Sequence, residues 1–139
     1  MSEQAAQTKE EKPRPEYGRP INDIIADLSK EIPTSMLHAK RAGGNEITFI
    51  PWYNATRLLD YYAPGWTYEI TRLQDVGEKQ VAIFVRLSIP AAEGVIFREA
   101  SGLEDDTVKG YGDPTSNAES MALRRAAAKF GLGRYLYQK

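Results

Sequence analysis

The residues best suited to chemistry in this 139-residue chain are three cations near its C-terminus, Arg124, Arg125 and Lys129. Around a helix at 100° per residue, they share an arc roughly opposite the apolar face formed by Leu123 and Phe130. Guanidinium groups match phosphate oxygens through paired hydrogen bonds, so cations at this spacing could follow successive groups of a nucleic-acid backbone. The alternative interpretation is that acidic residues of the same chain neutralise them.

The distribution of charge makes the cations more conspicuous than the total suggests. The formal net charge is −1, but residues 118–139 carry a net +4 and residues 21–117 a net −5. The neutral total therefore hides a basic C-terminal segment attached to an acidic body. Cations elsewhere would extend a DNA path, although a lone surface cation is usually only a solvated group; they are Lys40, Arg41 and Lys109.

Aromatic side chains offer a second kind of contact with nucleic acid, because bases stack on them. Trp52 and Tyr53 are the best candidates, since they lie near a predicted helix start beside Asn54. Most other aromatic residues are expected in the core or at a subunit interface. The single histidine, His38, is expected at a helix end or in the core.

Composition excludes several other chemistries. With no cysteine and one histidine, the chain cannot build a disulfide scaffold, a thiolate nucleophile or a His-rich metal site. Glu104, Asp105 and Asp106 resemble a metal cluster, but adjacent carboxylates in a loop do not readily converge on metal ions. A solvated acidic loop is therefore favoured over a metal-dependent nuclease, and neither a metal site nor a cofactor is expected.

The length fits one domain around one hydrophobic core. Residues 1–20 contain three prolines and few large apolar side chains, so they are predicted to form a disordered tail before a single domain at 21–139. Short amphipathic helices are predicted over residues 21–32 and 51–62. No apolar run approaches the roughly 18 residues of a membrane span, and no signal peptide is seen, so a soluble cytoplasmic protein without membrane partners is expected.

Three strands and a last helix follow. The strands are predicted at residues 66–71, 81–89 and 95–100, where hairpin-length connections favour an antiparallel meander. After a glycine-rich acidic loop at 102–114, a helix is predicted over 116–130, with Ser116 and Glu119 as a capping box and Gly131 as its stop. The fold class is therefore α+β: a three-stranded antiparallel meander packed by a long C-terminal helix, with short N-terminal helices.

Several segments, in this order, resemble the Rad52/Rad22 single-strand annealing family, in a bacterial or phage branch similar to DNA damage response protein A. They are Arg41–Gly44, Ile47–Ile50, Gly65-Trp66, Arg98–Gly102 and Ala122–Tyr137. The resemblance covers about residues 21–137. It implies a β-β-β-α core and an oligomeric ring that holds single-stranded DNA in a basic groove. It also implies pairing of complementary strands in recombination and DNA repair, without catalysis or ATP.

The resemblance further implies which residues contact DNA. Arg124 and Arg125 match the family's basic pair on the helix, which contacts the phosphate backbone, and Ser120 matches a hydroxyl residue one turn earlier at the groove. The implied partners are single-stranded DNA, further copies of the chain in a ring or open helix, and a recombinase or single-strand binding protein. A nucleoid-associated location follows from these partners.

Two positions depart from the family pattern. Asn54 stands where the family usually has an arginine at the start of the second helix, and Arg57, one turn later, is the candidate substitute. The family's third helical cation falls on Ala128, with Lys129 as its nearest neighbour. Two other functions remain as alternatives: an oligomeric scaffold that binds protein partners, and the metal-dependent nuclease.

Overall fold

The computed structural model describes residues 16–77, 80–105 and 114–137, and its helices and strands follow the α+β order expected from the sequence. In chain order the elements are α2 (Ile21–Leu28), the 3-10 helix η1 (Thr34–Met36), β1 (His38–Ala42), β2 (Asn45–Phe49), α3 (Trp52–Tyr62), β3 (Thr67–Gly77), β4 (Gln80–Ala91), β5 (Gly94–Asp105), α4 (Pro114–Lys129) and the 3-10 helix η2 (Arg134–Tyr137).

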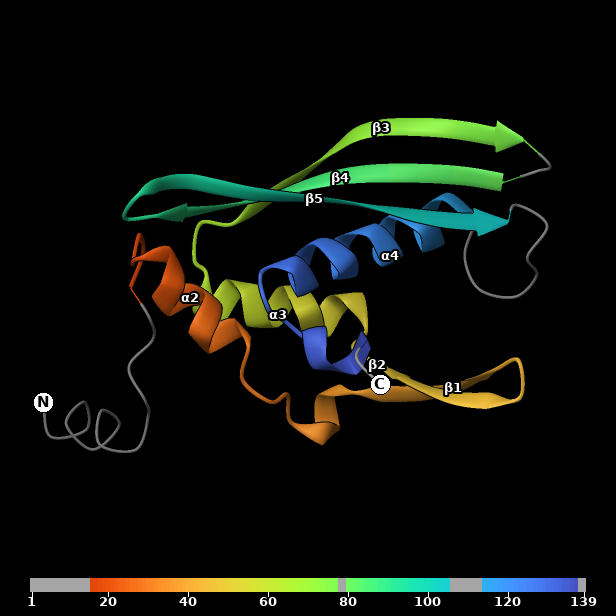
Figure 1. Cartoon of the computed structure of the whole chain (residues 1–139), viewed down its shortest axis with the longest axis horizontal. Coiled ribbons are helices and arrows are strands. Elements are labelled where there is room, and N and C mark those ends of the chain that lie inside the picture. The colour runs from red at the N-terminus through yellow and green to blue at the C-terminus, as the bar shows by residue number, and fades with distance from the viewer. Residues whose placement is uncertain (1–15, 78–79, 106–113, 138–139) are drawn as a thin grey trace, which may run out of the picture.

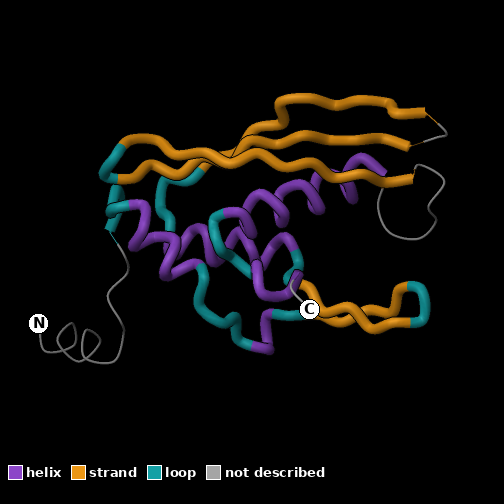
Figure 2. Tube along the Cα trace, viewed as in Figure 1, coloured by secondary structure: helices purple, strands orange, loops and turns teal. Residues whose placement is uncertain are grey.

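The elements form three layers. Strands β3, β4 and β5 make an antiparallel sheet in that order, and β1 pairs with β2 in a separate antiparallel hairpin. Helix α4 lies along one face of the three-stranded sheet, with α2 and α3 beyond it and the β1–β2 hairpin on the far side (Figure 1). Figure 2 shows the helices between the two sheets. The predicted meander packed by a C-terminal helix is confirmed.

The central strand β4 has the alternating pattern that its sequence predicts. Its inward residues Ile83, Val85, Leu87 and Ile89 are all fully buried. They face α4, and Phe130, which directly follows α4, also lies in the core. An apolar row of period two on a central strand buries one face of a sheet completely, which fixes the register of the neighbouring strands.

Helix α4 approaches β5 closely because both surfaces are made of small residues. Ala118, Ala122 and Ala126 are fully buried at this contact. Gly102 of β5 lies against them: a Cβ there would overlap the Ala118 carbonyl oxygen and come within 2.8 Å of the Ala122 amide nitrogen. This glycine therefore sets the distance between the sheet and the helix that carries the basic residues.

The strands extend further than the sequence predicts, and the acidic loop is correspondingly shorter. β3 reaches Gly77 and β5 reaches Asp105, because both residues pair with Gln80, the first residue of β4. Polar residues such as Asp75 are tolerated there because they are exposed. The prediction of a loop from Gly102 is wrong for residues 102–105, and the remainder of it, 106–113, lies outside the described residues.

Two local predictions are wrong. α4 begins at Pro114, so Ser116 lies at a position within the helix and not at the N-cap position; proline favours the first helical turn, which starts the helix earlier. His38 is exposed at the start of β1 and does not end a helix. The Gly43-Gly44 turn pairs this strand with β2, since both glycines have positive φ, 58° and 82°, as a type I′ hairpin turn requires.

The predicted tail divides at the limit of the described residues. Residues 1–15 lie outside them, so disorder there stays a prediction. Arg19 lies inside them and forms an ion pair with Asp27 at 2.9 Å, and it also donates to the Tyr62 carbonyl. Within the described part of the chain, no helix has the length and apolar character needed to cross a membrane.

Candidate nucleic-acid interface

Two cations of α4 extend along the margin of β5. The Arg125 guanidinium donates to the Ser101 carbonyl oxygen at 3.0 Å, and the Lys129 ammonium donates to the Glu99 carbonyl oxygen at 2.6 Å. Both side chains are exposed beyond these contacts. The backbone of β5 thus orients the two charges without neutralising them, because a carbonyl oxygen carries no formal charge.

Arg124 turns to the opposite side of α4, toward the β1–β2 hairpin. Its guanidinium lies over the Phe49 ring, 5.1 Å from the centroid, and its Nε donates to the Ser120 carbonyl oxygen at 3.2 Å. Burial lowers the pKa of Arg124, and the charge of Arg125 acts in the same direction while Tyr137 opposes both. A half-buried cation beside another cation gains stability from any anion that approaches it.

The cations of α4 line two neighbouring cavities. The first, called here the hairpin groove, has a volume of about 270 Å³ and lies between the β1–β2 hairpin, α4 and η2. Its lining includes Lys40 and Phe49 of the hairpin, Arg124 and Arg125 of α4, and Tyr137 of η2. Lys40 also lies over the Phe49 ring, 5.5 Å from the centroid, so one aromatic ring supports two cations.

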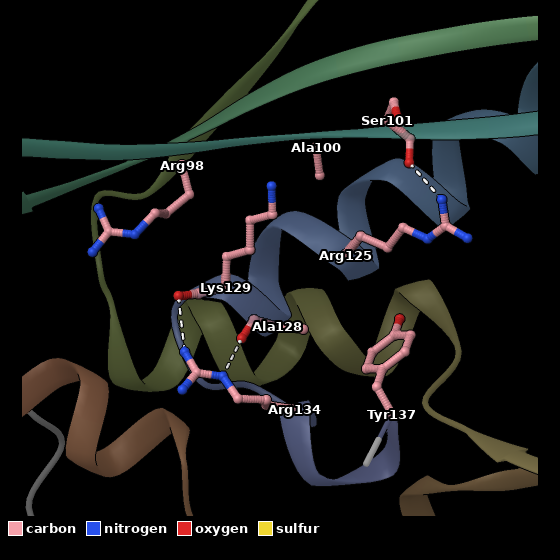
Figure 3. A pocket seen from close by; sticks show the side chains of 8 residues that line it. All are labelled: Arg98, Ala100, Ser101, Arg125, Ala128, Lys129, Arg134 and Tyr137. Carbon is pink, nitrogen blue, oxygen red and sulfur yellow. Dashed lines mark hydrogen bonds between the residues drawn. The ribbon is translucent and has the colours of Figure 1, made fainter. Parts of the chain in front are cut away.

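The second cavity, called here the β5-edge pocket, is open and has a volume of about 690 Å³. Four cations from three elements surround it: Arg98 of β5, Arg125 and Lys129 of α4, and Arg134 of η2 (Figure 3). Arg134 donates to the carbonyl oxygens of residues 128 and 129, both at 3.2 Å, and so binds the C-terminal end of α4.

Among the residues that the structure describes, neither cavity has an acidic residue in its lining. In the part of the chain that the structure describes, the ion pairs join Arg19 and Lys30 to Asp27, and Arg86 to Glu99. The cations of the hairpin groove and the β5-edge pocket take part in none of them. The interpretation in which carboxylates of the same chain neutralise the basic helix therefore fails among the described residues.

A protein-family model matches the sequence of most of the chain. Residues 20–139 match the model described as the Rad52/22 family double-strand break repair protein. The chain belongs to the Rad52/Rad22 family. This confirms the resemblance drawn from the sequence segments and places the chain among DNA repair proteins of the Rad52 type.

Two plant proteins are similar to this Rad52/Rad22 family chain. It is 33% identical over 136 residues to the DNA repair RAD52-like protein 1, mitochondrial, of Arabidopsis thaliana. The aligned region covers 97% of this chain and 77% of that protein. It is 37% identical over 124 residues to the DNA repair RAD52-like protein 2, chloroplastic, of the same plant, covering 87% of this chain and 62% of that protein. The assignment to a bacterial or phage branch stays a prediction.

Not every residue that the sequence suggested lies at the two cavities of this family member. Asn54 is buried, and its side-chain amide donates to the Met36 carbonyl at 3.0 Å, so it holds the start of α3 inside the fold. Arg57 is exposed on α3 and Arg41 on β1, but neither lines the hairpin groove or the β5-edge pocket. Lys109 lies outside the described residues.

Ser120 and Trp52 meet at a third cavity, of about 360 Å³, between α3, α4 and β3. Trp52 is 51% exposed and packs edge-on against Tyr53, which is 43% exposed. In the same cavity, the Tyr68 hydroxyl donates to the Glu119 carboxylate at 2.6 Å. This hydrogen bond, together with burial and the carboxylate's charge, raises the pKa of Tyr68 to about 12.

Sequence reasoning missed two cations of the β5-edge pocket. Arg98 occupies an inward position on β5 opposite Leu87, and an arginine at an inward position of a strand is the one signal that was present. Arg134 lies at the pocket because η2 folds back onto the end of α4. The sequence does not predict this contact. Its Nε contacts the carbonyl of Ala128, the position where the family pattern places its third helical cation.

The acidic residues proposed for a nuclease do not form a loop cluster here. Glu104 and Asp105 belong to strand β5, and Asp106 lies outside the described residues. Among the residues that the structure describes, no group of three carboxylate or histidine side chains is placed to hold a metal ion. The structure therefore offers the nuclease interpretation no support.

Proposed function

We propose that this Rad52/Rad22 family chain binds single-stranded DNA in the hairpin groove and anneals complementary strands as an oligomer, without catalysis and without a nucleotide cofactor. The observation that carries the proposal is the arrangement around Arg124. This half-buried cation lies beside Arg125 and near Lys40, and the described lining of the groove contains no carboxylate. A phosphate backbone supplies the negative charge that such a groove lacks.

The proposed mechanism is electrostatic. Cations that bind phosphates release condensed counterions, which favours binding of any strand regardless of its sequence. Because backbone contacts leave the base edges unread, the bases stay accessible to a complementary strand. Trp52 and Tyr53, exposed at the start of α3, are candidates for stacking with one or two bases.

Two features of the sheet support self-association. β3, of 11 residues, is an outer strand of the described sheet, and a long unpaired strand edge favours pairing with another chain. Ile70 and Leu73 of β3 pair with the buried residues Val85 and Ile83, yet they remain 45% and 57% exposed. Apolar residues on an inward face that none of the described elements covers fit a subunit contact. Repetition of a weak site in an oligomer would then raise affinity through effective concentration.

The test is annealing of two complementary oligonucleotides, followed by fluorescence, with a metal chelator and without nucleotide. We expect the wild-type chain to accelerate annealing and the Arg124→Ala, Arg125→Ala double variant to lose this effect while its circular dichroism is unchanged. Arg72→Ala is the matched control, because Arg72 pairs with Phe84 on the other face of the sheet. No acceleration by the wild-type chain, or a dependence on metal or nucleotide, would contradict the proposal.

The oligomeric state is tested separately by native mass spectrometry at micromolar concentration. A ring or open helix gives a mass that is a multiple of the chain mass. The substitutions Ile70→Asp and Leu73→Asp should reduce that mass, because they place charge in the apolar surface of β3. A clean monomer of the wild-type chain would contradict the oligomeric part of the proposal.

A further inference from the structure

The hairpin groove and the β5-edge pocket are adjacent and share part of their lining. Both are lined by Arg125 and Tyr137, so a ligand that leaves the groove past these two residues enters the pocket. Besides Lys129 of α4, the pocket adds two cations that the groove lacks, Arg98 and Arg134. Neither was a candidate from the sequence, and neither lies on the face of α4 on which the proposed function depends.

We infer that the β5-edge pocket is a second phosphate subsite on the path of the same strand, with Arg98 and Arg134 as its own phosphate-binding residues. The inference rests on the proposed function, since it takes the strand in the hairpin groove as the starting point. The ligand chemistry is an internal phosphodiester group of a single strand. The subsite thus predicts additional phosphates per subunit and a direction in which the strand leaves the groove.

The fold holds both arginines in place while leaving donors unused. Arg98 lies over the Phe130 ring, 4.9 Å from the centroid, and donates one hydrogen bond, to the Phe97 carbonyl at 3.1 Å. Arg134 donates through two of its nitrogens to carbonyls at the end of α4. A guanidinium has five N–H donors, so each arginine keeps some for a phosphate. Restricting their motion in advance lowers the entropy that binding costs.

The charge around the pocket favours an anion over other ligands. Arg98, Arg125, Lys129 and Arg134 surround it from β5, α4 and η2, and no carboxylate is present in its lining where the structure describes the chain (Figure 3). Like charges gathered in this way repel one another, and an anion among them removes the repulsion. The C-terminal end of a helix ordinarily repels anions, because its free carbonyl oxygens carry partial negative charge. Here Arg134 donates hydrogen bonds to the carbonyl oxygens of residues 128 and 129 at the C-terminal end of α4. The volume of about 690 Å³ is ample for a phosphate and its sugar.

The test compares the Arg98→Gln, Arg134→Gln double variant with the wild-type chain in a salt series. The probes are two oligonucleotides of one sequence, one with a 5′-hydroxyl and one with a 5′-phosphate. We expect binding about tenfold weaker for two lost exposed contacts. The slope of log affinity against log salt should fall by about 1.4, at about 0.7 per phosphate contact. Both losses should be equal for the two probes, because internal phosphates are common to both.

Two further variants separate charge from structure. Arg98→Lys with Arg134→Lys keeps both charges, so it should retain most of the salt slope even where its stability falls. Arg72→Gln removes one charge from the other face of the sheet and should leave the slope unchanged. A change in melting temperature alone, without a change in slope, would show that Arg98 and Arg134 are structural residues and would overturn the inference.

The outcomes also distinguish this inference from the proposed function. If the wild-type chain binds neither probe, the proposed function fails. If the wild-type chain binds both and depends on Arg124, but the Arg98→Gln, Arg134→Gln variant binds equally well, only the second subsite is wrong, and an acidic protein partner becomes the better occupant of the pocket. A loss confined to the 5′-phosphate probe would assign the pocket to strand ends and contradict a continuous path.

Discussion

Replacing Gly102 with alanine should separate α4 from the sheet. The added Cβ would overlap the Ala118 carbonyl oxygen and come within 2.8 Å of the Ala122 amide nitrogen. Both are backbone atoms of a helix whose contact face is fully buried, so no side-chain rotation relieves the overlap. Either α4 or β5 must move by a fraction of an ångström or more.

The expected cost is in the upper part of the range for overpacked cores, about 3 kcal/mol in the free energy of unfolding. For a chain of this length, that corresponds to a melting temperature lower by roughly 10 °C. Movement of α4 also breaks the hydrogen bond between Arg125 and the Ser101 carbonyl, so affinity for single-stranded DNA should fall with stability.

The assay is thermal unfolding followed by circular dichroism, with Ser101→Ala as the control. Ser101 immediately precedes Gly102 in β5. It pairs with Phe84, so its side chain lies on the side of the sheet away from the α4 contact. It should change the melting temperature by less than about 2 °C, as substitutions outside the core usually do. If the Gly102→Ala chain has the same melting temperature as the wild-type chain, the close approach of α4 to β5 is refuted.

Three further predictions test individual residues. Asn54→Ala should destabilise the fold by about 1–3 kcal/mol, because it leaves the Met36 carbonyl without the donor of its hydrogen bond. Its affinity for single-stranded DNA should stay at the wild-type value. Chemical denaturation measures the stability, and a binding titration measures the affinity. The pKa of Tyr68 is raised from 10.0 to about 12 by its hydrogen bond to Glu119, so its contribution to stability is present below pH 10 and is lost as the pH rises to about 12. Tyr68→Phe should remove that part of the pH dependence of unfolding, and an equally steep decline in the variant would contradict it. Trp52→Ala should weaken single-strand binding by about 1–3 kcal/mol without changing the salt slope, because stacking releases no counterions; fluorescence anisotropy at several salt concentrations measures both.

The sequence predicts the sheet and α4 well because their signals are local and strong. The alternation along β4 places one row of apolar residues inside, and alanines with Leu123 and Phe130 mark the buried face of α4. The ends of the elements are less predictable. β3 and β5 continue through polar residues because β4 offers them backbone partners, and a strand is extended by pairing even where its side chains carry no pattern.

Part of the candidate site could be predicted, because three of its cations lie on one helix. Helical geometry places Arg124, Arg125 and Lys129 away from the apolar face, but it does not show that Arg124 is half-buried toward the hairpin while Arg125 and Lys129 lie exposed along β5. Arg98 and Arg134 join the site only through tertiary packing. Asn54 shows the opposite case, since a polar residue at a helix start can equally be buried to satisfy a carbonyl.

The most direct test of the account is the salt dependence of single-stranded DNA affinity for the wild-type chain and the Arg124→Ala, Arg125→Ala double variant. If these guanidinium groups bind phosphates, the double variant binds more weakly and its slope of log affinity against log salt is smaller by about 1.4. Circular dichroism should show the same fold for both chains. Equal affinities and equal slopes would contradict the claim that α4 holds a DNA strand.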